Sequence, residues 1–281
     1  SSCHILLDSL QKICLMHGIE VDYYKKLFQT AGNIIELIEK DDIPKYLLFL
    51  ENVFPYMDNY NYQKGMKEII QELKNFLKPK DIGTDSDRAL LLDFQATLEI
   101  KPEKAIKLEK DALAQIETIT ADNARLVSNL HANLGGLYRM NGHPDLAREH
   151  MEKSISLLDQ FNLLHINDSI PQIANYAMFL TEQQEPERGI SELQKLSGII
   201  KEYHSDDCLD YAKVQETLGT IYLMTANLPQ AKTHFKRAFK IYEKIWADEP
   251  EMIEAKYQEI QELYPQIGFC IGKNLSGLLT K

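Results

Sequence analysis

Two sets of small residues return along this chain every 42 residues, and this period constrains the fold more than any local motif does. The first set follows a leucine or a tyrosine and consists of Gly135, Ala177 and Gly219. The second set consists of Ala105, Ala147, Gly189 and Ala231. Two independent sets in one register indicate a repeated structural unit. Arrays of such units bind partners along a surface and seldom carry out chemistry.

The composition favours a folded, helical chain. Hydrophobic residues make up 44% of the 281 residues and aromatic residues 9%, which is enough to fill a core. Glycine (13) and proline (10) are scarce, which favours helices over short strands. The net charge of −11 argues against direct nucleic-acid binding, which needs a basic stripe. Two local lysine groups, at 74–80 and 232–240, have acidic residues close on either side.

Cysteine usage and hydropathy indicate the compartment. The four cysteines, Cys3, Cys14, Cys208 and Cys270, show no CxxC pairing and are expected to be reduced. No run approaches the roughly 20 apolar residues that a membrane span needs, and no charged-then-apolar leader opens the chain. We therefore expect a cytoplasmic protein. The abrupt start at Ser1, without an initiator methionine, favours a fragment of something longer.

One repeat unit can be followed between positions 128 and 161. Leu134 and Tyr138 belong to an apolar stripe with helical spacing. Gly142 then suits a left-handed helix end, and Pro144 suits the first turn of the next helix. A second apolar stripe begins at Ala147. The unit is therefore predicted to be a hairpin of two antiparallel helices, and such hairpins must stack because neither helix buries its stripe alone.

The spacing of small and aromatic residues is the same in the two clearest units. These are Leu134-Gly135, Tyr138, Ala147 and Ser154, and Leu218-Gly219, Tyr222, Ala231 and Ala238. This pattern resembles the tetratricopeptide repeat (TPR), and the 42-residue period is similar to the long-helix type found in kinesin light chains and in bacterial signalling proteins. The resemblance implies an all-α fold: a right-handed α-α superhelix (TPR solenoid) of stacked antiparallel helix hairpins.

The expected organisation has three parts. Residues 1–80 are interpreted as degenerate N-terminal hairpins, with helices near 3–17, 21–39, 43–57 and 62–78; a separate helical domain is the alternative. Residues 81–247 hold the repeats, at about 85–120, 126–161, 168–203 and 209–246. Residues 248–281 are interpreted as C-terminal capping helices. Asp93 and Leu196 stand where small residues are expected, and we expect looser packing in those two units.

The small residues have a physical cause, because they let neighbouring helix backbones approach closely. The structural repeat positions are Gly135, Tyr138, Ala147, Ala177, Gly189, Gly219, Tyr222 and Ala231. A leucine in place of Ala147 or Ala231 should overpack the interface by roughly 1–3 kcal/mol.

One cluster resembles a set of metal ligands: His204, Ser205, Asp206, Asp207, Cys208 and Asp210. It falls between two repeats, where Asp and Ser side chains cap helix starts, so we expect caps and no metal site there. The sequence contains no Gly-rich phosphate loop, HExxH or GxSxG motif. We therefore expect no cofactor and no enzymatic activity.

Asn133 and Asn175 are the candidates for ligand binding. Each precedes a core position on the first helix of its repeat, on a face expected to turn toward the concave wall. The resemblance implies that asparagines at this place hold the backbone of an extended peptide, which an amide matches as donor and acceptor. The alternative is that they bond to carbonyls of a neighbouring helix. The expected peptide-binding residues of the concave groove are Asn129, Asn133, Arg139, Asn175, Met178, Lys213, Thr217 and Thr220.

The sequence therefore predicts a non-catalytic TPR scaffold that recognises an extended peptide or partner segment in its groove. The alternative is the peptide-sensing C-terminal domain of a larger bacterial transcriptional or signalling regulator. A third, weaker interpretation is an inhibitory subunit that occludes the active site of an enzyme. The expected partner is a protein or peptide, with no nucleic acid and no membrane; a homodimer stays open.

Overall fold

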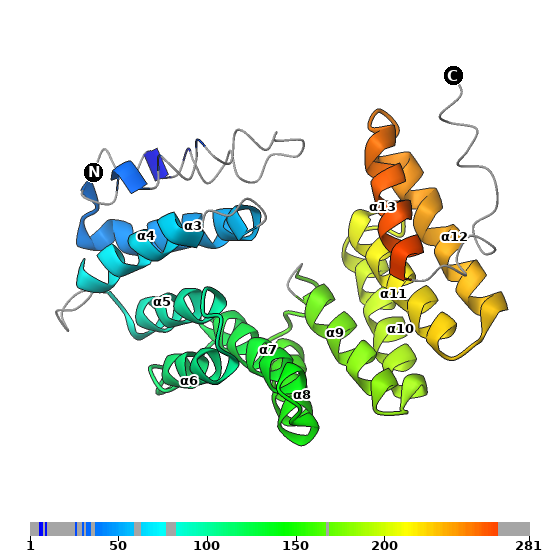
Figure 1. The fold of residues 1–281 in the computed structure, drawn as a ribbon, viewed down its shortest axis with the longest axis horizontal. Helices are drawn as coiled ribbons and strands as arrows, with labels where there is room; N and C mark the ends of the chain where they lie inside the picture. Colours follow the sequence, from blue (N-terminus) through cyan, green and yellow to red (C-terminus); the bar gives the residue numbers. More distant parts are fainter. Residues whose placement is uncertain are drawn as a thin grey trace. The chain divides into compact units, whose positions relative to one another are not determined.

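The chain folds into helices that form two compact units, Ser1–His143 and Pro144–Lys281. The computed structural model describes residues 37–58, 63–76, 83–166 and 169–263, with a few isolated positions before residue 37, and these ranges contain no strand. The helix predicted near 3–17, most of that near 21–39, and the segment after 263 lie outside the described residues. The predicted all-α class is confirmed, and each unit is described by itself below (Figure 1).

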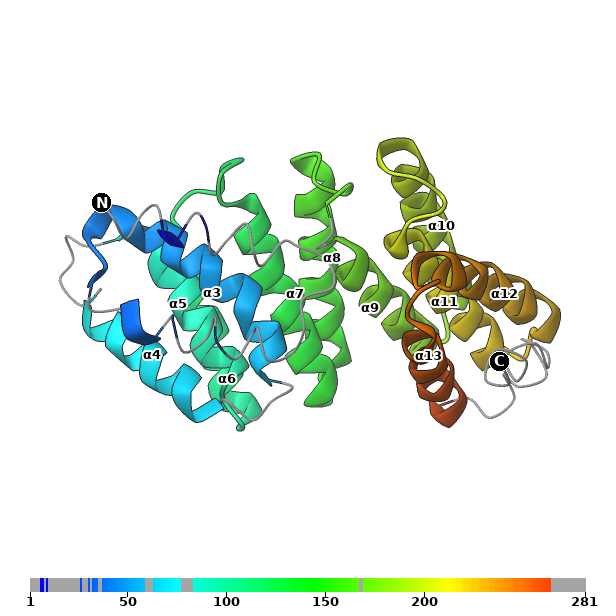
Figure 2. The ribbon, with the colours of Figure 1, turned by 90° about the horizontal axis from the view of Figure 1, so that it is seen from above.

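The first unit is organised around helix α5. Its α-helices within the described ranges from residue 37 on are α3 (Ile43–Asp58), α4 (Gln63–Phe76), α5 (Asp85–Thr97), α6 (Pro102–Leu113) and α7 (Ala124–Met140). Helix α5 contacts the other four, and Figures 1 and 2 both show α5 and α6 side by side. The sequence sets the start of α5, because the Thr84 side chain accepts from the Asp87 backbone N–H while the Asp87 carboxylate accepts from the Thr84 N–H.

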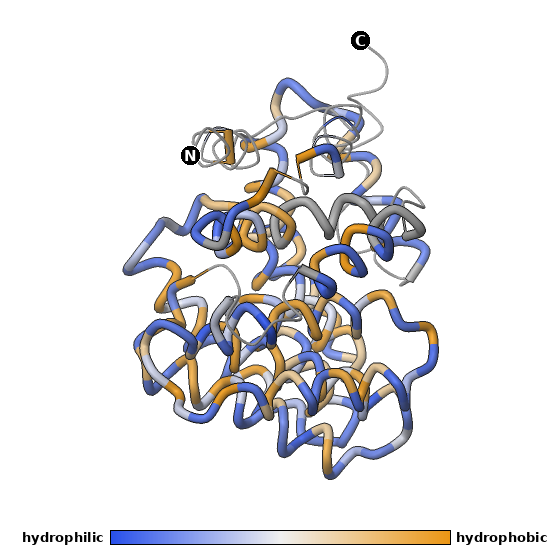
Figure 3. The backbone as a smooth tube through the Cα atoms, turned by 90° about the vertical axis from the view of Figure 1, so that its left-hand side faces the viewer, coloured by the Kyte–Doolittle hydropathy of each residue, from blue (hydrophilic) through white to orange (hydrophobic). Residues whose placement is uncertain are grey.

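The second unit is a series of hairpins around a continuous apolar core. Its helices are α8 (Pro144–Gln160), α9 (Ser169–Glu182), α10 (Pro186–Tyr203), α11 (Leu209–Met224), α12 (Leu228–Ile245) and α13 (Pro250–Leu263). Helix α9 packs on α10 and α11 on α12. Hydrophobic and hydrophilic stretches alternate along the backbone (Figure 3). Leu196 is fully buried in this core, so the looser packing expected there is not observed.

The turns that follow α7, α9 and α11 repeat one backbone conformation. Gly142, Gln184 and Ala226 occupy the same place in the repeat, and their φ angles are 75°, 66° and 59°, all in the left-handed region. In each turn the next residue's N–H bonds to the carbonyl five residues back; for the last turn Asn227 donates to Tyr222 at 2.7 Å. This is the Schellman end of a helix, and the left-handed conformation predicted for Gly142 is confirmed.

Two glycines of the second unit allow close helix packing, as the repeat pattern predicts. A Cβ on Gly189 would lie 2.7 Å from the carbonyl oxygen of Ala177 on the neighbouring helix. A Cβ on Gly219 would lie 2.9 Å from the ring of Phe235. Both helix pairs therefore approach to a distance that a methyl group would block.

Polar pairs connect successive hairpins inside the second unit. The Ser154 hydroxyl of α8 donates to Gln172 Oε1 of α9, and both residues are buried. The Gln215 amide of α11 donates to Ser197 Oγ of α10 at 3.4 Å, and Gln215 Oε1 lies 2.9 Å from His234 Nδ1. Burial, followed by the nearby Arg237, lowers the pKa of His234. The neutral ring can then donate from Nδ1 to Gln215.

Candidate functional site

The predicted binding residues of the first unit lie on α7. Asn129 and Arg139 are half-buried, whereas the Asn133 side chain is exposed. Asn133 is nevertheless engaged, because its Nδ2 donates to Asp93 Oδ1 of α5 at 2.8 Å. The partner of this asparagine is therefore a side chain of a neighbouring helix, where the alternative interpretation expected a backbone carbonyl.

Asp93, Glu109 and Asn133 form a polar junction of α5, α6 and α7. Glu109 is only 2% exposed, and its carboxyl and that of Asp93 are hydrogen-bond partners. Glu109 Oε2 is buried and accepts no hydrogen bond from a described donor. Two carboxyl groups in contact satisfy such an oxygen when one of them carries a proton. We expected loose packing at Asp93, and the structure has this polar junction there instead.

Both carboxyl groups hold their protons more tightly than usual. Burial raises the pKa of Asp93, although the hydrogen bonds from Glu109 and Asn133 oppose the rise. Burial, followed by the negative charge of Asp93, raises the pKa of Glu109 to about 10. At neutral pH Glu109 therefore keeps its proton, and Asn133 donates a hydrogen bond to Asp93. No described lysine or arginine contributes to either shift.

A cavity of about 260 Å³ lies on the first helices of the first unit. Its apolar lining comes from Leu47 of α3, Leu90 of α5 and Leu126 of α7, and its polar lining includes Arg125 and Asn129. Asn129 is the one predicted binding residue in it. Such a mixed, small hollow fits a side chain of a bound polypeptide better than a cofactor, since cofactor and drug sites occupy roughly 300–1,000 Å³.

The predicted residues of the second unit lie on α9 and α11. Asn175 is exposed, and no described residue hydrogen-bonds to its side chain. Met178 packs against the apolar core. Lys213 is exposed and lies 3.8 Å from Asp210. The Thr217 hydroxyl donates to the Lys213 carbonyl within its own helix, and Thr220 is half-buried.

A second cavity, of about 280 Å³, lies between α11, α12 and α13. Lys213 lines it together with Leu209, Trp246, Met252 and Lys256. The Trp246 ring stacks on Tyr242 at 4.8 Å between centroids. The cavity therefore combines an aromatic wall with two lysines and the carboxylate of Glu259.

Glu216 anchors α13 beside this cavity. Its carboxylate accepts from the Tyr242 hydroxyl at 2.6 Å and pairs with Lys256 at 3.0 Å. Burial, followed by the Glu216 charge, raises the pKa of Tyr242. Burial lowers the pKa of Lys256, but the charges and hydrogen bonds of Glu216 and Glu259 together outweigh it and raise that pKa. Both groups therefore stay protonated and donate to Glu216.

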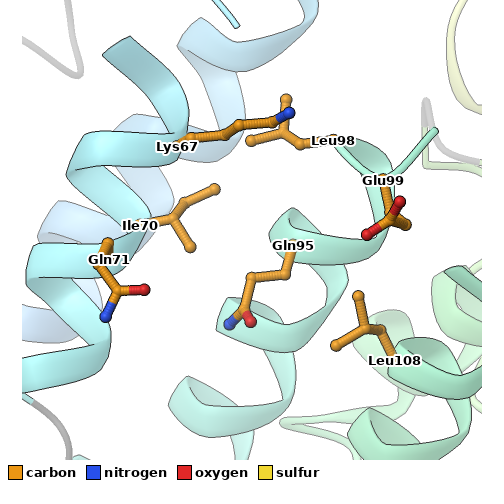
Figure 4. Close-up of a pocket in the computed structure, with 7 residues that line it drawn as sticks. All are labelled: Lys67, Ile70, Gln71, Gln95, Leu98, Glu99 and Leu108. Atoms are coloured by element: carbon orange, nitrogen blue, oxygen red, sulfur yellow. The ribbon is translucent and has the colours of Figure 1, made fainter. Parts of the chain in front are cut away.

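A third cavity, of about 220 Å³, contains none of the predicted residues. Figure 4 shows Ile70 and Gln71 of α4 facing Gln95 of α5, with Lys67, Leu98, Glu99 and Leu108 completing the lining. The Gln95 amide bonds to the Leu91 carbonyl of its own helix at 3.2 Å. The sequence carried no signal for this hollow.

The segment 204–210 forms a helix start. Cys208 is the N-cap of α11, and its sulfur accepts from the Tyr211 N–H at 3.4 Å. The expected cap is thus a cysteine; Ser205 accepts instead from the Asp207 N–H. Within the described ranges no three His, Cys, Asp or Glu residues converge as metal ligands. No described helix is long and apolar enough to cross a membrane.

Sequence reasoning missed Glu109 and the aromatic wall of the second cavity. The 42-residue register contained a signal for Glu109, because the corresponding positions are Met151, Leu193 and Phe235, which are all buried hydrophobics. A glutamate in such a column needs a polar partner. No comparable signal existed for Trp246 and Met252, whose proximity to Lys213 depends on where α13 packs.

The fold and its cavities define an array of helical hairpins of the kind that binds proteins. Residues 169–244 match the model of the tetratricopeptide repeat family. The predicted resemblance to this family, and to kinesin light chains, is confirmed by this match and by solved structures. A comparison of the sequence with curated proteins finds no match.

The similar structures share the fold at low sequence identity. BtubC (BKLC) from P. vanneervenii matches with a TM-score of 0.56 and 18% identity, over 73% of this chain and 82% of that chain. The nearly identical TPR-like repeats of a Podosopora anserina putative kinesin light chain match with a TM-score of 0.53 and 14% identity, over 66% and 92%. A Rap protein complexed with Competence and Sporulation Factor matches with a TM-score of 0.54 and 16% identity, over 96% and 76%.

Proposed function

We propose that this protein recognises an extended peptide or partner segment along the first helices of its hairpins. Its TPR fold is a scaffold that generally binds proteins without catalysis. The observation that carries the proposal is that each unit has a cavity lined by one residue predicted from the sequence to bind peptide, Asn129 in the first and Lys213 in the second. Each hollow accepts one side chain of a partner.

Asn175 is the residue that this proposal uses for the peptide backbone. Its amide is exposed and no described residue hydrogen-bonds to it, so both its donor and its acceptor can pair with a peptide group. Asn133 differs, because one of the two N–H donors of its amide already bonds to Asp93. Asn133 therefore has one donor fewer for a ligand than Asn175.

The test begins with peptides selected from a random display library on the purified protein. For the tightest peptide, Asn175→Ala combined with Lys213→Ala should weaken binding at least tenfold, which corresponds to about 1.4 kcal/mol. Gln194→Ala, an exposed change on the second helix of a hairpin, should leave the affinity within twofold. Equal affinities for all three proteins would place peptide binding outside the first helices.

A second candidate is the peptide-sensing part of a larger bacterial regulator. The Rap protein that matches 96% of this chain is complexed with Competence and Sporulation Factor, so a protein of similar fold binds a factor of that name. The full open reading frame tests this candidate. A DNA-binding or effector domain encoded upstream would support it, and a reading frame limited to hairpins would favour the scaffold.

A further inference from the structure

Helix α12 carries a lysine at every fourth position, and these four residues are called the basic row: Lys232, Lys236, Lys240 and Lys244. All four side chains are exposed, and Figures 1 and 2 both show α12 at the edge of the second unit. Four residues advance about 6 Å along a helix, so the basic row is about 18 Å long.

The basic row stands out against the charge of the whole chain. Helix α12 contains five basic residues, the row and Arg237, and one acidic residue, Glu243, so its net charge is +4. The chain as a whole has a net charge of −11, so all other residues together carry −15. The row is therefore a local positive surface on an acidic protein.

The repeat pattern does not explain these lysines. The positions 42 residues earlier, on α10, are Ile190, Gln194, Gly198 and Glu202, and those on α8 are Arg148, Glu152, Ser156 and Gln160. Their net charges are −1 and 0. Stacking of hairpins is thus compatible with neutral residues at this place, and the four lysines belong to α12 alone.

The protein itself neutralises only one end of the row. Lys244 forms an ion pair with Asp207, whose pKa it lowers, with a further contribution from Lys240. Lys232 and Lys236 have no ion pair with any described residue. Like charges four residues apart destabilise a helix. A binding partner of opposite charge would remove this repulsion.

We propose that the basic row docks an acidic segment of a partner protein, with carboxylates spaced one helical turn apart. Charge complementarity supports this occupant, since glutamates at every fourth position of a helix have the same axial spacing as these lysines. The segment that follows Leu263 contains no Asp or Glu, so it does not supply the acidic segment.

This second surface is independent of the cavities on the first helices. Tyr242 and Trp246, which line the cavity of the second unit, are not members of the row. A variant of the row should therefore lose the acidic partner and keep the peptide of the preceding section. The two proposals can fail separately.

The probe is a 15-residue alanine-based helical peptide with four glutamates at every fourth position, measured by fluorescence anisotropy. Lys236→Glu/Lys240→Glu should weaken its binding at least tenfold. Lys104→Glu/Lys107→Glu changes the net charge by the same amount at exposed positions of α6, and should change the affinity less than twofold. A peptide with glutamine for glutamate should not bind, and 200 mM salt should weaken the acidic peptide relative to 50 mM.

Three results would overturn the proposal. The first is an equal loss in both double variants, which shows that only total charge matters. The second is no binding of the acidic peptide to the unmodified protein at 50 mM salt. The third is that single-stranded RNA or phosphatidylserine vesicles bind more tightly than the acidic peptide, and that this binding is lost in the Lys236/Lys240 variant. The row would then be a binding site for phosphate groups.

Discussion

The two units fill the same pair of repeat positions with different kinds of side chain. In the second unit, Gly219 of α11 packs against the ring of Phe235 on α12. The positions in the same register of the first unit are Asp93 of α5 and Glu109 of α6, which are partners in a buried carboxyl pair. The second unit therefore depends on the size of its side chains at this position, and the first unit depends on a proton. The same arrangement of helices is therefore compatible with a glycine against an aromatic ring and with a protonated carboxyl pair.

The largest expected effect tests the dependence on size. Gly189→Ala places a methyl group 2.7 Å from the Ala177 carbonyl oxygen, which is backbone and cannot move aside. We expect a loss of about 3 kcal/mol in the free energy of unfolding, measured with urea. Gly198→Ala is the control on the same helix, where a Cβ meets nothing within 4 Å. This change should stabilise α10 by about 1 kcal/mol, and a similar loss in both variants would contradict the packing argument.

The next effect tests the dependence on a proton. The pKa of Glu109 is about 10 in the folded protein, against an ordinary value of 4.5. Between these pH values the unfolded chain releases its proton first, so this group lowers stability as pH rises, by up to about 1.4 kcal/mol per pH unit. Below pH 4.5 both states are protonated and the penalty is absent.

Glu109→Gln should remove this pH dependence. Because the neutral amide carries no such penalty, the variant is expected to gain at least about 2 kcal/mol over the unmodified protein at pH 8, against the roughly 5 kcal/mol that the full slope would give, and little at pH 4, in urea unfolding. Asp111→Asn, an exposed change on the same helix, should leave the difference between the two pH values unchanged. A pH profile that Glu109→Gln does not alter would show that the pair holds no proton.

A smaller effect tests whether the Phe235 ring can shift to make room for an added methyl group. Gly219→Ala places its methyl group 2.9 Å from the Phe235 ring, and a ring can shift where a carbonyl cannot. We expect a loss of about 1–2 kcal/mol. Combined with Phe235→Leu, the loss should be less than the sum of the two single losses, because the smaller side chain leaves room. Strict additivity in thermal unfolding would exclude this contact as the cause.

The smallest effect concerns a feature that both units share. Gln184 and Ala226 adopt the left-handed conformation that Gly142 adopts without strain. Gln184→Gly and Ala226→Gly should each raise the free energy of unfolding by about 0.5–1 kcal/mol. Gly142→Ala should lower it by a similar amount. Destabilisation by the two glycine substitutions would mean that chain entropy outweighs the strain.

The repeat architecture could be predicted from the sequence because the small residues return every 42 positions. The left-handed conformation of Gly142 could be predicted because the residue is a glycine. That of Gln184 and Ala226 follows only from their equivalent place in the repeat. Asp93 was recognised as a departure from the pattern. The carboxyl pair that Asp93 forms was not predicted, because Glu109 lies on another helix and meets Asp93 only through packing.

The candidate site was less predictable than the fold. Asn129 and Lys213 were named from their places on the first helices, and each lines a cavity. The walls of those cavities come from three helices each, so their composition depends on tertiary positions. Asn133 and Asn175 look equivalent in sequence, and only the neighbouring Asp93 makes them different.

The buried serine–glutamine pairs of the second unit have a consequence for assembly. Hairpins built on one pattern can slide along each other, since their apolar faces are nearly uniform. Gln172 bonds to a serine on α8, and Gln215 bonds to a serine on α10 and contacts a histidine on α12. A hairpin shifted along its neighbour would bury an amide without a partner, at a cost of about 1–3 kcal/mol. The polar pairs therefore favour the native alignment of neighbouring helices over shifted ones.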